Sequence, residues 1–481
     1  MFRTLNLFFL CSLSLLLSPL AQAYSPAAGI KGALCVIRAD HKLVLIHEVI
    51  TNKISLPGGT IQEGEPPELA AQRETWEETG LVVTVGDELG RTDSAVLFDC
   101  VSDSEIIAYS VNNSLGGNEL PVWFAPHYGI EVKSAMLLYP QELSPQQYRY
   151  PGQWRTVEEI FAVATEQPVA YVAELTGSAP SYRQLELTWI VRLQSWVKSF
   201  SPQVQQGVHF AANLIDGLTS ASMLLLLFPV ALARFGLSFV YRLFFAVTVT
   251  SLMVLIAQQG FALPRPHVYV SLGNLTDSYG YNLPSLPLAL WFCIATFIFH
   301  RSKTFGINQI TATITALVML IMLSKLYLGA AFLLDMLVGA MLGALVAWHI
   351  LRLEAKPEVN VDQLMKSKGV WFFLTAATAV VMLFWPLPVF TRWLAILITA
   401  SALVISTNQC MAEFSSRHMQ ISVVVLVFVD QLYRYVASVS TSSGFWSLVI
   451  QTFHYPLLML VFMLLARRLT EASRQQIDAL D

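Results

Sequence analysis

The sequence predicts a multidomain protein in which an α/β/α sandwich is followed by an all-α polytopic membrane bundle of about nine spans. Two observations carry this prediction. The 481-residue chain is 55% hydrophobic and has a mean hydropathy of +0.55, which is typical of membrane proteins. Charges are dense over residues 31–206, whereas apolar runs of roughly 17 to 22 residues follow one another from 210 to 465.

The N-terminus, residues 1–23, resembles a cleavable secretory signal. A single arginine precedes an apolar stretch over Leu7–Leu17, and small residues at Ala21 and Ala23 form a cleavage site. An uncleaved signal anchor is the alternative, and it leaves the following domain on the same side of the membrane. Both interpretations predict that the next domain is exported.

Residues 24–170 form the predicted α/β/α domain. Four runs rich in β-branched and aromatic residues are expected to be strands, and a closing helix is expected at 153–162. Cys35 and Cys100 each lie in an apolar, strand-like run, so a disulfide and two buried free thiols are both open alternatives. The strands are expected at 32–40, 42–49, 104–111 and 120–126.

The strongest chemical signal is the stretch GTIQEGEPPELAAQRETWEETGL, residues 59–81. Pro66 and Pro67 suit the first turn of a helix, where missing N–H donors cost little, and Gly80 suits its C-terminal end. The sequence therefore predicts a helix between these prolines and this glycine.

Three carboxylates share one face of this helix, because Glu74, Glu77 and Glu78 fall at positions i, i+3 and i+4. Such crowding is repulsive by roughly a few tenths of a kcal/mol per exposed pair unless a divalent cation lies between the side chains. Oxygen ligands select a hard ion, Mg²⁺ or Mn²⁺. A solvated acidic face is the alternative interpretation.

The spacing Gly-x5-Glu-x7-Arg-Glu-(apolar)-x-Glu-Glu-x-Gly-(apolar) resembles the box of the Nudix hydrolases, and the resemblance covers about Ala27 to Val169. Thr75 departs from the box, since the family has an aliphatic residue there, but its side chain is β-branched and of similar volume. The resemblance implies the Nudix sandwich fold and hydrolysis of a phosphoanhydride that links a nucleoside or another group to a second moiety.

The resemblance also implies residue roles. The metal would be held by the Gly59 carbonyl together with the three carboxylates, and it would lower the pKa of a bound water that attacks phosphorus. Arg73 would pair with Glu65 and fix the loop against the helix. Glu131 is a candidate base outside the box, or else a surface acid. The implied catalytic residues are Arg73, Glu74, Glu77 and Glu78.

Residues 180–205 form a linker between the two parts. Over Tyr182–Phe200 a helix would place an apolar stripe on one side, which is typical of a helix in the membrane interface; packing against a protein core is equally open. The stripe comprises Trp189, Leu193, Trp196, Val197 and Phe200.

Nine membrane spans are expected after the linker. Most lysines and arginines of the connecting loops lie on the side of the C-terminal tail, so the positive-inside rule places Asp481 in the cytoplasm. Nine crossings then place the Nudix-like domain on the extracytoplasmic, periplasmic side of the inner membrane. The spans are expected near 210–230, 238–257, 284–300, 308–324, 331–351, 370–388, 392–409, 419–438 and 445–465.

Residues 207–355, the first five spans, resemble the type 2 phosphatidic acid phosphatases. The family motifs Lys-x6-Arg-Pro, Pro-Ser-Gly-His and Ser-Arg-x5-His-x3-Asp have degenerate counterparts at span ends on the extracytoplasmic face. Ala331 and Pro287 replace the two histidines that attack phosphorus and protonate the leaving group, and neither can do so. The counterparts are Gln258-x6-Arg265-Pro266, Pro284-Ser285-Leu286-Pro287 and Ser324-Lys325-x5-Ala331-x3-Asp335.

The residues of these motifs that survive predict a degenerate site that binds phosphate without cleaving it by the histidine route. An ion pair between Arg265 and Asp335 is the structural alternative, and His267 could act as a substitute nucleophile. The surviving residues are Arg265, Ser285, Lys325 and Asp335. Residues 356–481 add four further spans and the tail, with Asp430 and Arg434 expected to pair.

The sequence therefore predicts a membrane-anchored, metal-dependent Nudix hydrolase that cleaves a diphosphate compound. The alternatives are a lipid phosphate or undecaprenyl diphosphate phosphatase in the membrane domain and a non-catalytic platform that binds lipid phosphate. Expected partners are a small or lipid-linked diphosphate and membrane lipids. Nucleic acid is not expected, because the net charge is −4 and no basic patch with interleaved aromatic residues is present.

Overall fold

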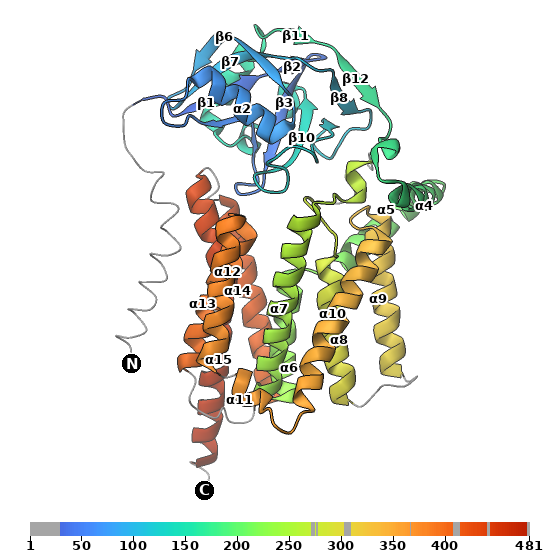
Figure 1. Ribbon diagram of the computed structural model, residues 1–481, viewed down its shortest axis with the longest axis vertical. Coiled ribbons are helices and arrows are strands. Elements are labelled where there is room, and N and C mark those ends of the chain that lie inside the picture. Colours follow the sequence, from blue (N-terminus) through green and yellow to red (C-terminus); the bar gives the residue numbers. More distant parts are fainter. Residues whose placement is uncertain are drawn as a thin grey trace.

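The computed structural model describes residues 29–270, 275, 278–302, 309–365, 367–406, 414–439 and 443–478. An α/β domain stands at one end of a bundle of helices, and the last helix ends at the opposite end of that bundle (Figure 1). The order of an α/β domain followed by a mostly helical part is therefore confirmed. The predicted signal at 1–23 lies outside the described residues.

The strands of the α/β domain form two sheets and a short parallel pair. In the first sheet β1 and β7 are parallel and the other neighbours are antiparallel. The first sheet has the order β5 (Gly58–Thr60), β1 (Gly32–Val36), β7 (Ala95–Ser102), β6 (Val83–Arg91). The second has the order β11 (Glu166–Gln167), β2 (Arg38–Ala39), β3 (Lys42–Glu48), β10 (Val132–Leu138), β9 (Asn118–Leu120), with β4 (Ile54–Ser55) on β3, and β8 (Ile106–Tyr109) pairs with β12 (Val169–Val172).

Two helices cover opposite faces of these sheets. Alternate residues of β1 point to opposite sides, so Cys35 joins the core beneath α2 (Pro67–Thr79), whereas Val36 joins the core beneath α3 (Trp154–Phe161). This arrangement confirms the α/β domain and the closing helix. Cys35 and Cys100 form a disulfide with their Cα atoms 5.4 Å apart, so of the two open alternatives the structure has the disulfide.

The predicted strand at 120–126 is wrong beyond its first residue. Leu120 ends β9, and the chain then turns between Pro121 and Pro126, which cannot donate ladder hydrogen bonds. The aromatic residues that favoured a strand instead serve the domain contact, since the ring of Trp123 lies 5.2 Å from that of Tyr269. Strand β6 was not predicted, whereas β7 contains the strand-like run around Cys100.

The helical part contains twelve of the described helices, which run from the linker to the C-terminus. They are α4 (Ser181–Lys198), α5 (Pro202–Gly217), α6 (Ala221–Phe235), α7 (Leu237–Phe261), α8 (Leu286–Ser302), α9 (Gln309–Tyr327), α10 (Leu333–Glu354), α11 (Val361–Met365), α12 (Lys368–Phe384), α13 (Pro388–Ser406), α14 (Ser416–Val439) and α15 (Gly444–Asp478). Short 3₁₀ turns lie at Pro140–Glu142, Pro145–Gln147, Pro151–Gln153, Thr176–Ser178 and Pro266–Val268.

Each predicted span coincides with a helix, but the first is broken. Four described helices, α7, α10, α14 and α15, are long and apolar enough to cross a membrane. Helices α5 and α6 pass the same test only together and are bent by 55° at their junction. Helices α8, α9, α12 and α13 are apolar but shorter. Helices with the length and composition of membrane spans are thus present among the described residues, and the count of nine stays a prediction.

The α/β domain is packed directly onto the bundle. The hydroxyl of Tyr109 donates to the carbonyl of Val268 at 2.5 Å, and residues from both parts share one hydrophobic core. Gly129 and Gly280 both have positive φ, and a Cβ on Gly129 would lie 2.9 Å from the Cα of Gly280. Only glycine therefore allows this close approach of the two backbones.

Helix α4 lies across one side of the bundle at the level of the α/β domain (Figure 1). Trp189 and Trp196 of the predicted stripe are exposed, whereas Val197 is buried against the protein. The buried face of α4 combines apolar residues, such as Leu187 and Ile190, with polar ones, and its Arg183 is only 1% exposed. The exposed aromatic residues suit a membrane interface, while Arg183, which the sequence placed outside the stripe, reaches into the bundle.

Replacing Thr75 with valine should stabilise the α/β domain by about 1 kcal/mol. Thr75 is fully buried in α2, and its Oγ1 has no hydrogen-bond partner among the described residues. The comparison is Thr79→Val, which should destabilise because the Thr79 hydroxyl donates to the Thr75 carbonyl at 2.6 Å. Thermal unfolding of the full chain in detergent measures both changes. A lower midpoint for Thr75→Val would contradict the prediction.

Candidate active site

Helix α2 has the boundaries that its prolines and glycine predict. Pro66 precedes it with extended backbone, Pro67 is its first residue, and Gly80 ends it in the left-handed conformation. The predicted metal-ligand carboxylates project from this helix, but they do not all reach the same place. Glu74 and Glu78 are buried, and Glu77 is partly exposed.

Arg73 is the hub of the charged cluster. Its Nε and Nη2 donate to the two carboxylate oxygens of Glu65 at 2.9 and 3.0 Å, a bidentate contact that ties the preceding loop to α2. Its Nη1 lies 2.9 Å from both Glu74 Oε1 and Glu77 Oε2, so one guanidinium nitrogen bridges two of the box carboxylates. A cation held by these two carboxylates would take over this contact, while Glu65 keeps Arg73 in place.

Glu78 points away from the bridged pair. Its Oε2 accepts a hydrogen bond from the backbone N–H of Gly58 at 2.8 Å, and the residue is 6% exposed. Gly59 lies against Glu74 instead, because a Cβ there would be 2.4 Å from the Glu74 carboxyl carbon. A side chain at position 59 would therefore displace the Glu74 carboxylate, and the roles of Gly59 and Glu78 as metal ligands stay predictions.

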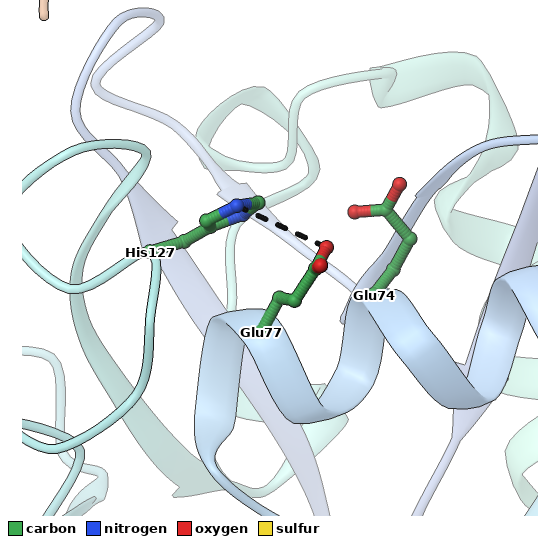
Figure 2. A group of neighbouring side chains, drawn as sticks. All are labelled: Glu74, Glu77 and His127. Atoms are coloured by element: carbon green, nitrogen blue, oxygen red, sulfur yellow. Dashed lines mark ion pairs between the residues drawn. The ribbon is translucent and has the colours of Figure 1, made fainter. Parts of the chain in front are cut away.

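His127 is a residue of the site that sequence reasoning missed. Its backbone N–H donates to the carbonyl of Glu77 at 2.7 Å, and its Nε2 lies 3.8 Å from Glu77 Oε2 (Figure 2). Its Nδ1 lies 3.3 Å from Glu131, the candidate base predicted outside the box. The signal that could have found it is the spacing of His127 and Glu131, four residues apart.

The electrostatics of the cluster follow from burial and from these contacts. Burial raises the pKa of Glu74, and Arg73 opposes this shift. Burial also raises the pKa of Glu78 well above its ordinary value, against the effect of the Gly58 N–H. Glu131 and His127 act on each other, so that the pKa of Glu131 is lowered and that of His127 is raised.

Glu74, Glu77 and His127 can hold a metal ion. Each offers one ligand atom, and these atoms lie within 4.8 Å of one another (Figure 2). Two carboxylate oxygens and one imidazole nitrogen suit Mn²⁺ or another transition ion better than an all-oxygen set does. Glu131 would then hold the second ring nitrogen of His127, as carboxylates commonly do behind metal-bound imidazoles.

Metal affinity should fall as the pH is lowered from about 8 to about 6, with roughly one proton released per ion at the lower pH. The metal needs neutral His127 and ionised Glu74, and both groups have raised pKa values, so protons compete with the ion. Calorimetric titration of Mn²⁺ in buffers of different ionisation enthalpy measures the release. His127→Gln should remove most of the proton release. A metal affinity that does not change with pH would contradict His127 and Glu74 as metal ligands.

The side chains of three of the four surviving residues of the phosphatase-like motifs already have internal partners, whereas the hydroxyl of Ser285 is buried and has none among the described residues. Lys325 Nζ lies 2.5 Å from Asp216 Oδ1, and Arg265 donates to the carbonyls of Tyr279 and Ala330 at 3.0 and 2.7 Å. Asp335 does not pair with Arg265; its carboxylate pairs instead with Arg183, and its backbone carbonyl accepts the N–H of Ser285 at 2.9 Å. Phosphate binding there stays a prediction, and it would require displacing Asp216 from Lys325.

Ala331 and Pro287, which stand where the family has its two histidines, have structural places in the bundle. Ala331 is 1% exposed and joins an apolar cluster with Leu288 and Met336, while Pro287 occupies the first turn of α8. His267 lies next to this region, and burial and the charge of Arg265 lower its pKa to about 3. Asp335 is engaged by Arg183, and among the described residues no aspartate pairs with the His267 ring as the family mechanism requires.

Comparison with known proteins gives a family match for the α/β domain and another for the helical part. Residues 30–166 match the NUDIX domain, and residues 239–357 match the PAP2 superfamily. A MutT-like protein of Streptomyces ambofaciens is 41% identical over 64 residues, which are 13% of this chain and 41% of that protein. This chain therefore spans less than half the length of that curated relative.

Among solved structures, the crystal structure of Aquifex aeolicus LpxE is similar to this chain at 24% identity. The similarity covers 35% of this chain and 95% of that one, with a TM-score of 0.29. The PAP2 match begins at 239 with α7, so helices α5 and α6, where Asp216 lies, come before it.

Proposed function

We propose that this chain, with a NUDIX domain at 30–166 and a PAP2-superfamily domain at 239–357, is a membrane-anchored hydrolase that cleaves phosphoanhydrides with a divalent metal. The observation that carries the proposal is the cluster on α2, where Arg73, locked by Glu65, bridges two carboxylates beside His127. No comparable set of acids and imidazole remains at the phosphatase-like motifs in the described residues.

Each residue of the cluster has a part in the reaction. Glu74, Glu77 and His127 would hold the cation, which when bound neutralises the diphosphate oxygens and activates water for attack on phosphorus. Glu131 stays ionised because His127 lowers its pKa, and it keeps the second nitrogen of His127 turned away from the carboxylates. Glu65 holds the guanidinium of Arg73 so that the loop before α2 keeps its shape.

The proposal places the NUDIX domain outside the cytoplasm. The disulfide between Cys35 and Cys100 supports it, since disulfides persist in oxidising compartments. The α/β domain and the end of α15 lie at opposite ends of the bundle, as expected if the bundle crosses an inner membrane (Figure 1). Phosphatase fused after Glu174 and a fluorescent protein fused after Asp481 would both be active with this topology, and the reverse pattern would contradict it.

The test is phosphorus NMR of the products from a panel of diphosphates, incubated with the purified full chain and Mg²⁺ or Mn²⁺. Nucleotide sugars, dinucleotides and lipid-linked diphosphates come first, because free nucleoside triphosphates are scarce outside the cytoplasm. The proposal expects cleavage of the phosphoanhydride bond in at least one of these compounds. EDTA should abolish that cleavage. Failure with the whole panel and both metals would contradict it.

A lipid phosphatase in the membrane domain is the second candidate, and the PAP2 match favours it. It predicts release of phosphate from a lipid phosphate monoester that survives EDTA and depends on Arg265. Ala331, Pro287 and the Asp335–Arg183 pair count against it, because they leave neither nucleophile nor acid. EDTA-resistant activity that Arg265→Ala abolishes would establish this candidate instead.

A further inference from the structure

A cavity of about 360 Å³ lies inside the bundle, between α6, α7 and α8 on one side and α13 and α15 on the other. Its volume falls within the range of roughly 300 to 1,000 Å³ that small-molecule sites occupy. Leu286 of the second degenerate motif lines it, whereas the charged residues of the motifs, Arg265, Lys325 and Asp335, do not. Helices α13 and α15 follow the PAP2 match, and the cavity therefore lies where that domain meets the C-terminal helices.

The cavity is long and its walls are apolar. Helix α13 lines it from Val389 to Leu403, fourteen residues apart, which is about 20 Å along a helix axis. Phe244 of α7 and Met459 of α15 line the same space, and methionine adapts readily to flexible ligands. A space of this length between helices that cross a membrane fits one extended hydrocarbon chain.

One end of the cavity carries the guanidinium of Arg392. Arg392, in the first turns of α13, lines the cavity, and its Nε donates to the Pro388 carbonyl at 3.4 Å. In the part of the chain that the structure describes, no carboxylate pairs with Arg392. The start of α13 packs close to Ile130 of the α/β domain, so this end of the cavity faces that domain.

The neighbouring acid is already engaged. Asp430 Oδ2 accepts from Arg434 Nε at 2.9 Å, as the sequence predicted, while Oδ1 accepts from Ser222 and lies 3.0 Å from His454 Nε2. Asp430 therefore already meets the guanidinium of Arg434 and the ring of His454, and among the described residues no ion pair joins it to Arg392. A guanidinium without a carboxylate partner at one end of an apolar cavity attracts an anion.

We infer that this cavity binds a membrane lipid with one long chain and a phosphate headgroup. The chain lies along α13 between α7 and α15, and the phosphate oxygens meet the guanidinium of Arg392, whose planar donors match phosphate geometry. The apolar walls contribute binding through the chain, and Arg392 selects the anionic headgroup. The inference does not depend on the hydrolase activity proposed for the α/β domain.

The test uses the full chain in nanodiscs and a long-chain alkyl phosphate that carries a photoreactive diazirine on its chain. Crosslinking followed by mass spectrometry should label peptides of α13, α15 and α7. Unlabelled alkyl phosphate should compete, whereas inorganic phosphate and the matching long-chain alcohol should not. Arg392→Gln should weaken labelling about ten-fold or more, and Arg417→Gln, an exposed cation outside the cavity lining, should leave it unchanged.

A second pair of variants tests the chain site without touching the cation. Ala400→Trp should block labelling by filling the cavity, and Leu403→Trp should exclude the long-chain probe while a short-chain analogue still binds. Size-exclusion profiles and thermal midpoints identify variants that misfold. Equal labelling by the alcohol, no effect of Arg392→Gln, or competition by inorganic phosphate would each overturn the inference.

Discussion

Replacing Glu77 with glutamine should reduce metal-dependent hydrolysis of a diphosphate by at least roughly 10³-fold, about 4 kcal/mol of transition-state stabilisation, without unfolding the α/β domain. Glu77 is the box carboxylate in contact with both Arg73 and His127, and its side chain is 22% exposed, so it can meet a substrate. Glutamine keeps the size of the side chain but removes the charge that a divalent ion requires. Initial rates and calorimetric metal titration measure the two losses.

The matched control is Glu68→Gln, which makes the same change on an exposed side chain in the first turn of α2. It should leave the rate within about two-fold, because surface substitutions of this kind change little. Glu78→Gln separates structure from chemistry, since Glu78 is buried and accepts the Gly58 N–H. An active Glu77→Gln enzyme with normal metal affinity would remove the α2 cluster as the active site.

Local spacing explains which parts of the site could be predicted. The contact of Arg73 with Glu65 and the position of Glu74 follow from residues within one short stretch, where helix geometry fixes which side chains meet. His127 comes about fifty residues later, on a turn that directly follows the strand predicted at 120–126. Its approach to Glu77 depends on how that turn packs against α2, and periodicity within a segment carries no information about this.

The same limit applies to the membrane half. The helix positions could be predicted because long apolar runs specify them, but the charge pairs join segments far apart in the chain. The sequence offered an ion pair between Arg265 of the first motif and Asp335 of the third as the structural alternative to phosphate binding. The structure pairs Asp335 with Arg183 instead, and Lys325 with Asp216 of the broken first span. Both partners lie before the PAP2 match, outside the motifs of that family.

Replacing Arg183 with methionine should destabilise the junction of the two domains by about 3–5 kcal/mol, since it leaves Asp335 buried without its cation. Arg183 and Asp335 are 1% and 0% exposed, and Arg183 Nη2 lies 3.0 Å from Asp335 Oδ1. Arg183 Nη1 also donates to the Pro264 carbonyl at 2.7 Å, and its guanidinium stacks on Phe332 at 4.3 Å. The loss should appear as a lower thermal midpoint of the full chain in detergent.

The double variant Arg183→Met with Asp335→Asn distinguishes the ion pair from the packing around it. Removing both charges leaves no buried charge unpaired, so much of the lost stability should return, and the cycle should give a coupling of roughly 1–3 kcal/mol. Arg192→Met, an exposed site on the same helix, should leave the midpoint unchanged. If the double variant is no more stable than Arg183→Met, the stacking and carbonyl contacts hold α4 to the bundle, and the carboxylate of Asp335 is not the partner that matters.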